Sequence, residues 1–365
     1  MTRPEAGRRD RLRAAAAAGG LDAVLVTDLL NVRYLTGFTG SNGALLLRTD
    51  GGDLFGTDGR YTTQAGTQVP DVELLVDRAT MPALARAART GGATRLGFES
   101  HVVTVDELHG LERLLGEGGA AVELVSIRRA VEALRAVKDE GEIEALRRAC
   151  AVADAALAEL AAEGALRPGR TELQVGRELD ARMLALGAEA PSFETIVAAG
   201  ANSAIPHHRP DSTELTEGDF LKLDFGATVD GYHSDMTRTL VLGHAADWQR
   251  EVYELVAASQ AAGRAALAVG AEVTAVDAAA RDVIVAAGHG EHFTHGLGHG
   301  VGLEIHEAPG ISALGAGTLA AGMAVTVEPG VYLPGHGGVR IEDTLIVTDD
   351  EPELLTLTSK ELLVL

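Results

Sequence analysis

The sequence has a single cysteine, few aromatic residues, a deficit of cationic side chains and no long hydrophobic run. Cys150 alone can form neither an intramolecular disulfide nor a cysteine-rich zinc site. With 4% aromatic residues, the core must be mostly aliphatic. Lysine and arginine total 31 against 53 acidic residues, a net charge of −22, which argues against a nucleic-acid groove or an anionic membrane surface as partner.

No apolar stretch approaches the ~20 residues that cross a bilayer. Acidic residues interrupt the arginines near the N-terminus, and no apolar segment of a signal peptide follows them. We therefore expect an acidic, cytoplasmic globular protein that binds neither nucleic acid nor a membrane.

The 365 residues suggest about two domains. Up to residue 125, short strands such as Ala23–Val26 and Arg95–Phe98 alternate with helical segments, which predicts a small α/β domain. From residue 127 the apolar spacing becomes helical, and Asp139 with Glu142 resembles a capping box. The expected domains are therefore residues 1–127 and 128–365.

The second domain mixes helices with strand pairs. Helices are expected over residues 171–186, 247–269 and 274–287. Strands are expected over Phe193–Ala198, Phe220–Thr228, Tyr232–Leu242, Ala324–Val327 and Val339–Val347.

Two aspartates are predicted to share one face of a β-hairpin. The dipeptide Asp230-Gly231 is typical of a type I′ turn. With these residues as the loop, Asp224 pairs with Thr237, and Asp235 lies diagonally across the same face. Two such carboxylates repel each other unless a cation or a proton lies between them. The alternative is a pair of solvated aspartates.

Two glutamates lie in similar surroundings. Glu328 follows the apolar run Ala324–Val327, and Glu342 lies within the expected strand Val339–Val347. A carboxylate in such strands is costly to bury unless it is paired or binds a metal. The alternative for each is a rim residue that points to water.

Histidines complete the candidate site. His295, His299 and His306 are separated by glycines, which permit the close backbone approach that a tight ligand site requires. The doublet His207-His208 forms a further loop cluster, which by itself carries little weight.

Four carboxylates with one histidine suit two divalent ions such as Mn²⁺, Co²⁺, Zn²⁺ or Fe²⁺. Four negative charges balance two such cations, and a two-metal site activates water and stabilises the oxyanion of a hydrolysed amide. The sequence contains no dinucleotide fingerprint and no phosphate-binding loop that would favour another cofactor.

Five ordered segments together resemble the pita-bread metallopeptidases, and within them the Xaa-Pro branch of aminopeptidase P and prolidase. These segments are Leu223–Gly226, Tyr232–Thr239, Gly296–Glu307, Glu328–Gly330 and Gly338–Asp343. Nearer the N-terminus, Asn31–Phe38 and Thr57–Tyr61 resemble the creatinase-type domain of the same branch. The resemblance implies an α+β protein with a C-terminal pita-bread domain and a smaller N-terminal α/β domain.

The resemblance also implies the roles of individual residues. The implied metal ligands are Asp224, Asp235, His299, Glu328 and Glu342, with Asp235 and Glu342 bridging two ions, for which Mn²⁺ is the first choice. His207 and His306 would contact the substrate or the oxyanion, with His208 open as the alternative to His207. Glu328 would pass a proton to the prolyl nitrogen. The remaining implied substrate-pocket residues are His295, Arg340 and Tyr232.

We expect an Xaa-Pro aminopeptidase that cleaves short proline-containing peptides as a homodimer. The alternatives are an Xaa-Pro dipeptidase, a methionine aminopeptidase, a creatinase-like amidinohydrolase and a non-enzymatic pita-bread binding protein. The complete ligand set argues against the last two. The N-terminal α/β domain argues against a methionine aminopeptidase, whereas no motif separates aminopeptidase P from prolidase.

Overall fold

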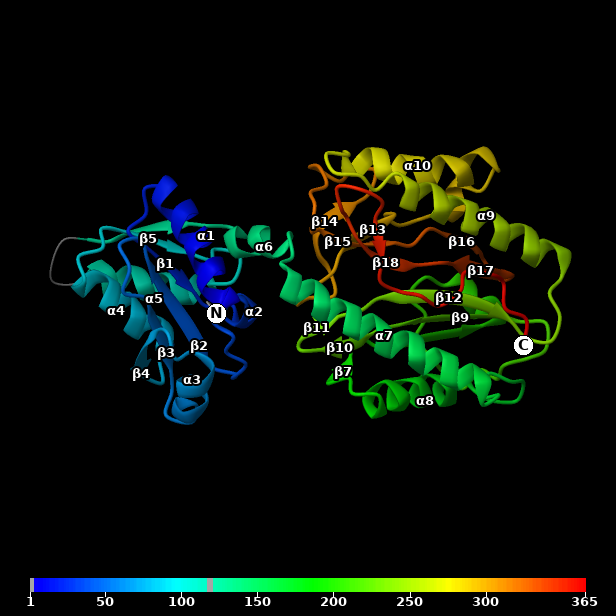
Figure 1. The fold of residues 1–365 in the computed structure, drawn as a ribbon, viewed down its shortest axis with the longest axis horizontal. Helices are drawn as coiled ribbons and strands as arrows, with labels where there is room; N and C mark the ends of the chain where they lie inside the picture. The colour runs from blue at the N-terminus through cyan, green and yellow to red at the C-terminus, as the bar shows by residue number, and fades with distance from the viewer. Residues whose placement is uncertain (1–2, 117–120) are drawn as a thin grey trace. The chain divides into compact units, whose positions relative to one another are not determined.

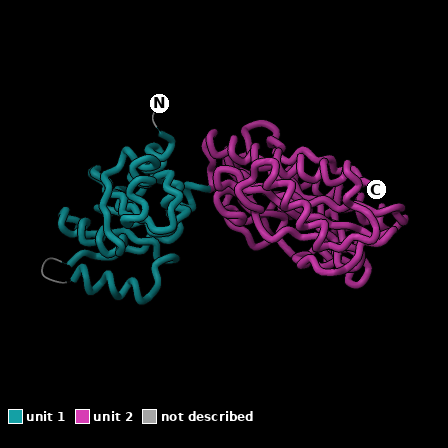
Figure 2. The backbone as a smooth tube through the Cα atoms, turned by 90° about the horizontal axis from the view of Figure 1, so that it is seen from below, with its two compact units in different colours: residues 1–135 teal, residues 136–365 magenta. Residues whose placement is uncertain are grey.

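The computed structural model describes residues 3–116 and 121–365 (Figure 1). The chain divides into two compact units, residues 1–135 and 136–365, which Figure 2 shows in different colours. The first unit extends beyond the expected boundary at residue 127, because helix α6 (Ala130–Arg135) belongs to it. Arg135 Nη1 of that helix donates to Asn31 Oδ1 at 2.9 Å.

The first unit is built on a six-stranded mixed sheet with the order β4-β3-β2-β1-β5-β6. The strands are β1 (Ala23–Val26), β2 (Gly43–Arg48), β3 (Leu54–Thr57), β4 (Glu73–Val76), β5 (Arg95–Phe98) and β6 (Glu123–Ser126). Every residue of the central strand β1 is buried, because helices cover both faces of the sheet (Figure 1).

The remaining helices of this unit are α1 (Pro4–Ala18), α2 (Leu29–Thr36), α3 (Thr62–Gln68), α4 (Thr80–Thr90) and α5 (Val105–Gly116). Apolar residues of α4 and α5 form one hydrophobic core with β1 and β2. Helix α2 was not expected from the sequence. Its N-cap is Asp28, whose side chain accepts hydrogen bonds from the amides of Leu30 and Asn31.

The second unit places its strands between two pairs of helices (Figure 1). These are α7 (Glu140–Ala162) with α8 (Glu172–Ala185), and α9 (Asp247–Ala265) with α10 (Val273–Ala286). The predicted capping box is present, because Asp139 accepts from the Glu142 amide while the Glu142 side chain accepts from the Asp139 amide. Across the described residues, no helix combines the length and the apolar character needed to span a membrane.

Several short sheets lie between the helices. The strands are β7 (Ala190–Pro191), β8 (Ile196–Ala199), β9 (Phe220–Phe225), β10 (Ala227–Val229), β11 (Tyr232–His233), β12 (Met236–Val241), β13 (Gly298–Gly300), β14 (Glu307–Ile311), β15 (Ala324–Val327), β16 (Gly330–Leu333), β17 (Gly337–Arg340), β18 (Asp343–Ile346) and β19 (Glu353–Leu354). One core joins α7 and α8 to β8, β9 and β12, and another joins α9 and α10 to β15, β17 and β18.

The predicted hairpin has the expected turn and register. Asp230 and Gly231 have φ angles of 50° and 76°, as a type I′ turn requires. Asp224 pairs with Thr237 across β9 and β12.

The prediction of one continuous strand over Val339–Val347 is wrong. It divides into β17 and β18, because β17 pairs with β16 whereas β18 pairs with β15. Ile341 and Glu342 lie between the two strands. This break puts Glu342 where one sheet ends and the next begins.

Candidate active site

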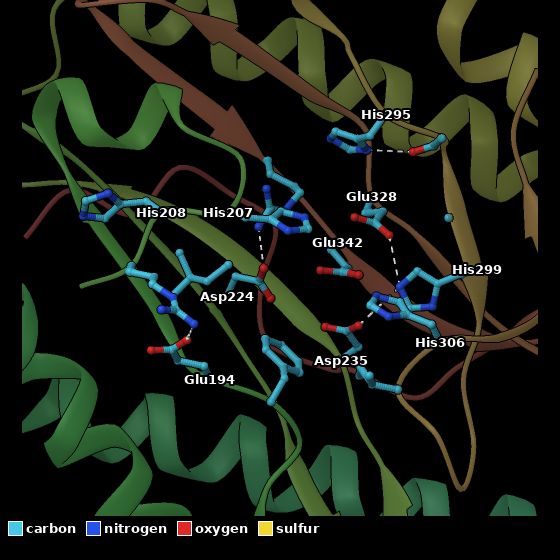
Figure 3. A pocket seen from close by; sticks show the side chains of 17 residues that line it. Glu194, His207, His208, Asp224, Asp235, His295, His299, His306, Glu328 and Glu342 are labelled. Carbon is cyan, nitrogen blue, oxygen red and sulfur yellow. Dashed lines mark hydrogen bonds and ion pairs between the residues drawn. The ribbon is translucent and has the colours of Figure 1, made fainter. Parts of the chain in front are cut away.

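A cavity of about 470 Å³ in the second unit brings together all five predicted metal ligands (Figure 3). Its other polar lining residues are Glu194, His207, His208, Arg209, His295, His306 and Arg340. Separate elements position the five ligands. Asp224 lies on β9, Asp235 directly before β12, His299 on β13, Glu328 directly after β15, and Glu342 between β17 and β18.

Glycines allow the backbone to bring His299 into the cavity wall. A Cβ atom on Gly298 would lie 2.0 Å from the carbonyl oxygen of Thr326, and one on Gly300 would lie 2.2 Å from that of Ala308. Only glycine permits these contacts, so the glycine-rich segment pairs as strand β13 with β14 and β15. The prediction of close backbone approach is confirmed.

The ring of His299 presents Nε2 to the acids. Nδ1 lies 3.0 Å from the Gly300 carbonyl oxygen, which can only accept, so Nδ1 carries the proton. Nε2 lies 3.5 Å from Asp235 Oδ2 and 3.3 Å from Glu328 Oε1. Three ligand atoms lie within 4.8 Å of one another, one each from Asp235, His299 and Glu342. A metal ion can bridge atoms at this spacing. A ring fixed by its second nitrogen is typical of a metal-ligating histidine.

Burial and mutual repulsion act on the acids. Desolvation raises the pKa of Asp235 and of Glu342, and the neighbouring carboxylates raise both further. Burial raises the pKa of Glu328 to about 7, although the Arg340 cation opposes the shift. In the described part of the chain, buried Asp224 Oδ1 has no hydrogen-bond partner. These carboxylates therefore require either protons or cations, and the donor set fits divalent ions.

Arg340 and Tyr332 form a polar wall beside the acids. The Arg340 guanidinium is ion-paired with Asp224, and its Nη1 donates to the Tyr332 hydroxyl at 2.7 Å. His295 Nδ1 lies 2.7 Å from the Gly296 carbonyl oxygen, so Nε2 accepts from the Tyr332 hydroxyl at 2.9 Å. Burial lowers the pKa of His295 to about 4, which keeps the ring neutral. Tyr332 was not expected at the site, and its only signal in the sequence is that an aromatic residue follows shortly after Glu328.

The structure separates the two histidines of the doublet. His208 is buried, and its Nε2 lies 2.7 Å from buried Glu172 Oε2. His207 is exposed and lies at the cavity wall (Figure 3). The ring of His306 packs edge-on against His299 with 4.5 Å between the centroids. The geometry therefore favours His207 and His306 as the histidines available to a ligand.

Tyr232 does not line the cavity. Its ring is buried, and its hydroxyl donates to Glu142 Oε1 of α7 at 3.0 Å. The predicted substrate contact has no support in this geometry, because the hairpin turns this side chain toward the helix. Five cavity-lining residues were not anticipated from the sequence: Phe193, Glu194, Ile196, Arg209 and Ile305.

Comparisons with known proteins agree with this site. The profile of Metallopeptidase family M24 matches residues 144–349, and that of the Creatinase/Prolidase N-terminal domain matches residues 8–137. The chain belongs to metallopeptidase family M24. The predicted pita-bread fold, the creatinase-type N-terminal domain and the hydrolase class are thereby confirmed, and the family uses a dinuclear metal centre.

Individual relatives of this M24 peptidase cover nearly its whole length. An Xaa-Pro dipeptidase of Pyrococcus horikoshii is 34% identical over 344 residues, which are 94% of this chain and 95% of that protein. The structure of an Xaa-Pro dipeptidase from Bacillus anthracis has a TM-score of 0.93 at 38% identity, covering 99% of this chain and 100% of that chain. That of an X-Pro aminopeptidase from Thermotoga maritima has a TM-score of 0.88 at 32% identity, covering 95% and 98%.

The raised pKa of Glu328 predicts how the metal-free M24 peptidase responds to pH. Its folded carboxyl group keeps a proton until about pH 7, whereas the ordinary value is 4.5. The folded state therefore binds more protons within this window, so the free energy of unfolding should fall with rising pH, by on the order of 3 kcal/mol for this group. Saturating Mn²⁺ should reduce this loss, because the cation replaces the proton.

Denaturant unfolding between pH 4.5 and 8, with and without Mn²⁺, measures this effect. Glu328→Gln in the metal-free protein should reduce the pH dependence, and the raised pKa values of Asp235 and Glu342 should account for the part that remains. A metal-free protein whose stability is constant or rises over this range would contradict the prediction.

Proposed function

We propose that this M24 peptidase is an Xaa-Pro dipeptidase that uses two divalent ions, with Mn²⁺ as the first choice. The observation that carries the proposal is the convergence of four carboxylates and His299 in one cavity. The Xaa-Pro dipeptidases among its relatives support a dipeptide substrate over the longer peptides of an aminopeptidase P. We therefore replace our first expectation, an Xaa-Pro aminopeptidase, with the dipeptidase.

The five donors Asp224, Asp235, His299, Glu328 and Glu342 would hold the ions. When bound, two such ions supply Lewis acidity that activates water and charge that stabilises an oxyanion. Thr237 donates to Glu342 Oε2 at 2.7 Å, which orients that carboxylate. Arg340 similarly holds Asp224. These contacts fix the carboxylates before a ligand arrives.

Two histidines and one glutamate would act on the substrate. His207 and His306 lie on the cavity wall with ring N–H groups that can donate to the oxygen of the scissile carbonyl. Glu328 is placed to carry a proton to the leaving nitrogen, because it lies at the cavity wall with Oε1 3.3 Å from His299 Nε2. The prolyl nitrogen of the substrate has no hydrogen, so its departure requires that proton.

Arg209 is our candidate for binding the free carboxylate of the prolyl residue. It lines the cavity, and its Nη2 lies 3.0 Å from Glu194 Oε2, with 83% and 64% of the two side chains exposed. An ion pair this exposed contributes at most ~1 kcal/mol. The guanidinium can therefore exchange Glu194 for a substrate carboxylate, which it can bind in a bidentate manner.

Arg209→Ala should raise KM for an Xaa-Pro dipeptide about 10- to 100-fold, since a hydrogen bond to a charged group contributes about 1.5–3 kcal/mol. Cleavage of the corresponding Xaa-Pro amide should change much less, because the amide has no carboxylate. Glu194→Gln is the matched control and should lower KM for the dipeptide by removing the competitor. Steady-state kinetics on both substrates decide the outcome. An equal loss on the dipeptide and the amide would contradict the role of Arg209.

Metal removal tests the catalytic class. Dialysis against a chelator should abolish cleavage of Xaa-Pro dipeptides, and added Mn²⁺ or Co²⁺ should restore it. Activity and metal content are measured on the same samples. A metal-free sample that keeps full activity would show that the carboxylate cluster has another purpose.

His207→Ala and His306→Ala should each lower kcat about 10²–10³-fold, the usual cost of losing one oxyanion contact. Both variants should keep their metal, because neither histidine belongs to the proposed ligand set. His208→Ala is the comparison for the doublet and should lower kcat less than His207→Ala while also lowering stability, since His208 contacts buried Glu172. Loss of metal from the His207 or His306 variant would reassign that residue to the ligands.

The homodimer and the cytoplasmic location stay predictions.

A further inference from the structure

The chain contains only three lysines, at positions 138, 222 and 360. Lys222 is completely buried, in the middle of β9 and two residues before Asp224. Because side chains two apart on a strand share a face, Lys222 points to the same side of the sheet as Asp224. An ammonium group in such a place must find acceptors, since an unpaired buried charge is strongly destabilising.

The acceptors are backbone carbonyl oxygens of the turn that precedes His207. Lys222 Nζ donates to Ser203 O at 3.1 Å, to Ile205 O at 2.7 Å and to Pro206 O at 3.3 Å. Three acceptors match the three N–H bonds of an ammonium group. Lys222 Nζ also lies 5.1 Å from the centroid of the Tyr332 ring, which closes the space around it.

The same turn is held on its other side through His208. His208 Nε2 contacts Glu172, and the second oxygen of Glu172 accepts from the Ala199 amide at 2.8 Å. His207 therefore lies between two anchors, Lys222 before it and His208 after it. The His207 side chain itself remains exposed at the cavity wall.

We propose that Lys222 is a positioning residue, whose buried ammonium group fixes the turn 203–206 and thereby holds His207 at the cavity. The kinetic consequence of this inference rests on the proposed peptidase function, whereas the fixing of the turn 203–206 does not. Lysine suits the task because its compact head group presents its donors from a single atom to carbonyl groups that converge on it, whereas a guanidinium spreads its donors over a plane.

Lys222→Met keeps the length of the side chain and removes its three donors. It should lower kcat on an Xaa-Pro dipeptide about 10- to 100-fold, the scale of a small misplacement of a reacting group. KM and metal content should change little. Lys222→Gln, which keeps two donors on a shorter stem, should be impaired less.

Double-mutant cycles separate positioning from general loss of stability. In a His207→Ala background, Lys222→Met should lower kcat less than about threefold, because the group that it positions is already gone. In the matched His306→Ala background its effect should remain as large as in the wild type. Full additivity with His207→Ala, or coupling to His306 instead, would overturn the proposal.

Hydrogen exchange gives a readout without any substrate. Peptides covering residues 200–209 should exchange faster in Lys222→Met than in the wild type, while peptides from α9 and α10 exchange equally in both. If the wild type does not cleave Xaa-Pro dipeptides, the proposed function fails, and this measurement still decides the inference. Unchanged exchange in residues 200–209 would overturn it, as would failure of both Lys222 variants to fold.

Discussion

Negative charge confined to one cavity is the constraint on which the second unit depends. Asp224, Asp235, Glu328 and Glu342 occupy its wall, and burial raises the pKa of the last three. Carboxylates gathered in one cavity repel each other in a medium of low polarity, so a fold that brings them together must also supply positive charge. Divalent ions would supply it at the centre, and fixed side chains supply it around the edge.

Further cations hold the segments that carry the site. Arg238 donates to the Glu342 carbonyl oxygen and contacts Asp343 Oδ1 at 2.8 Å, while Lys360 Nζ lies 2.8 Å from Asp343 Oδ2. Lys138 Nζ lies 3.0 Å from Glu307, next to His306 in the chain. Buried cations thus hold segments beside a proposed ligand and a proposed catalytic histidine. Such rigidity keeps a catalytic geometry in place without the help of the substrate.

Local patterns explain which parts of the fold could be predicted. The Asp230-Gly231 turn and the alternation of β9 together fix the pairing of Asp224 with Thr237. The capping box at Asp139 likewise depends only on residues three apart. By contrast, the break within Val339–Val347 arises from pairing with distant segments, because β17 pairs with β16 whereas β18 pairs with β15. Sequence periodicity carries no information about such partners.

The sequence by itself singled out the candidate carboxylates and histidines, because such residues stand out in apolar or glycine-rich segments, and the family resemblance supplied the proposed ligand set. It also determined the family, through five ordered motifs. Only the tertiary structure decided between His207 and His208, turned Tyr232 toward Glu142, and revealed Tyr332, Arg209 and Lys222 at the site. The physical reason is that a side chain's role depends on the hydrogen-bonding and charged groups around it. Those groups come from elements far apart in the chain, so they meet only when the fold is complete.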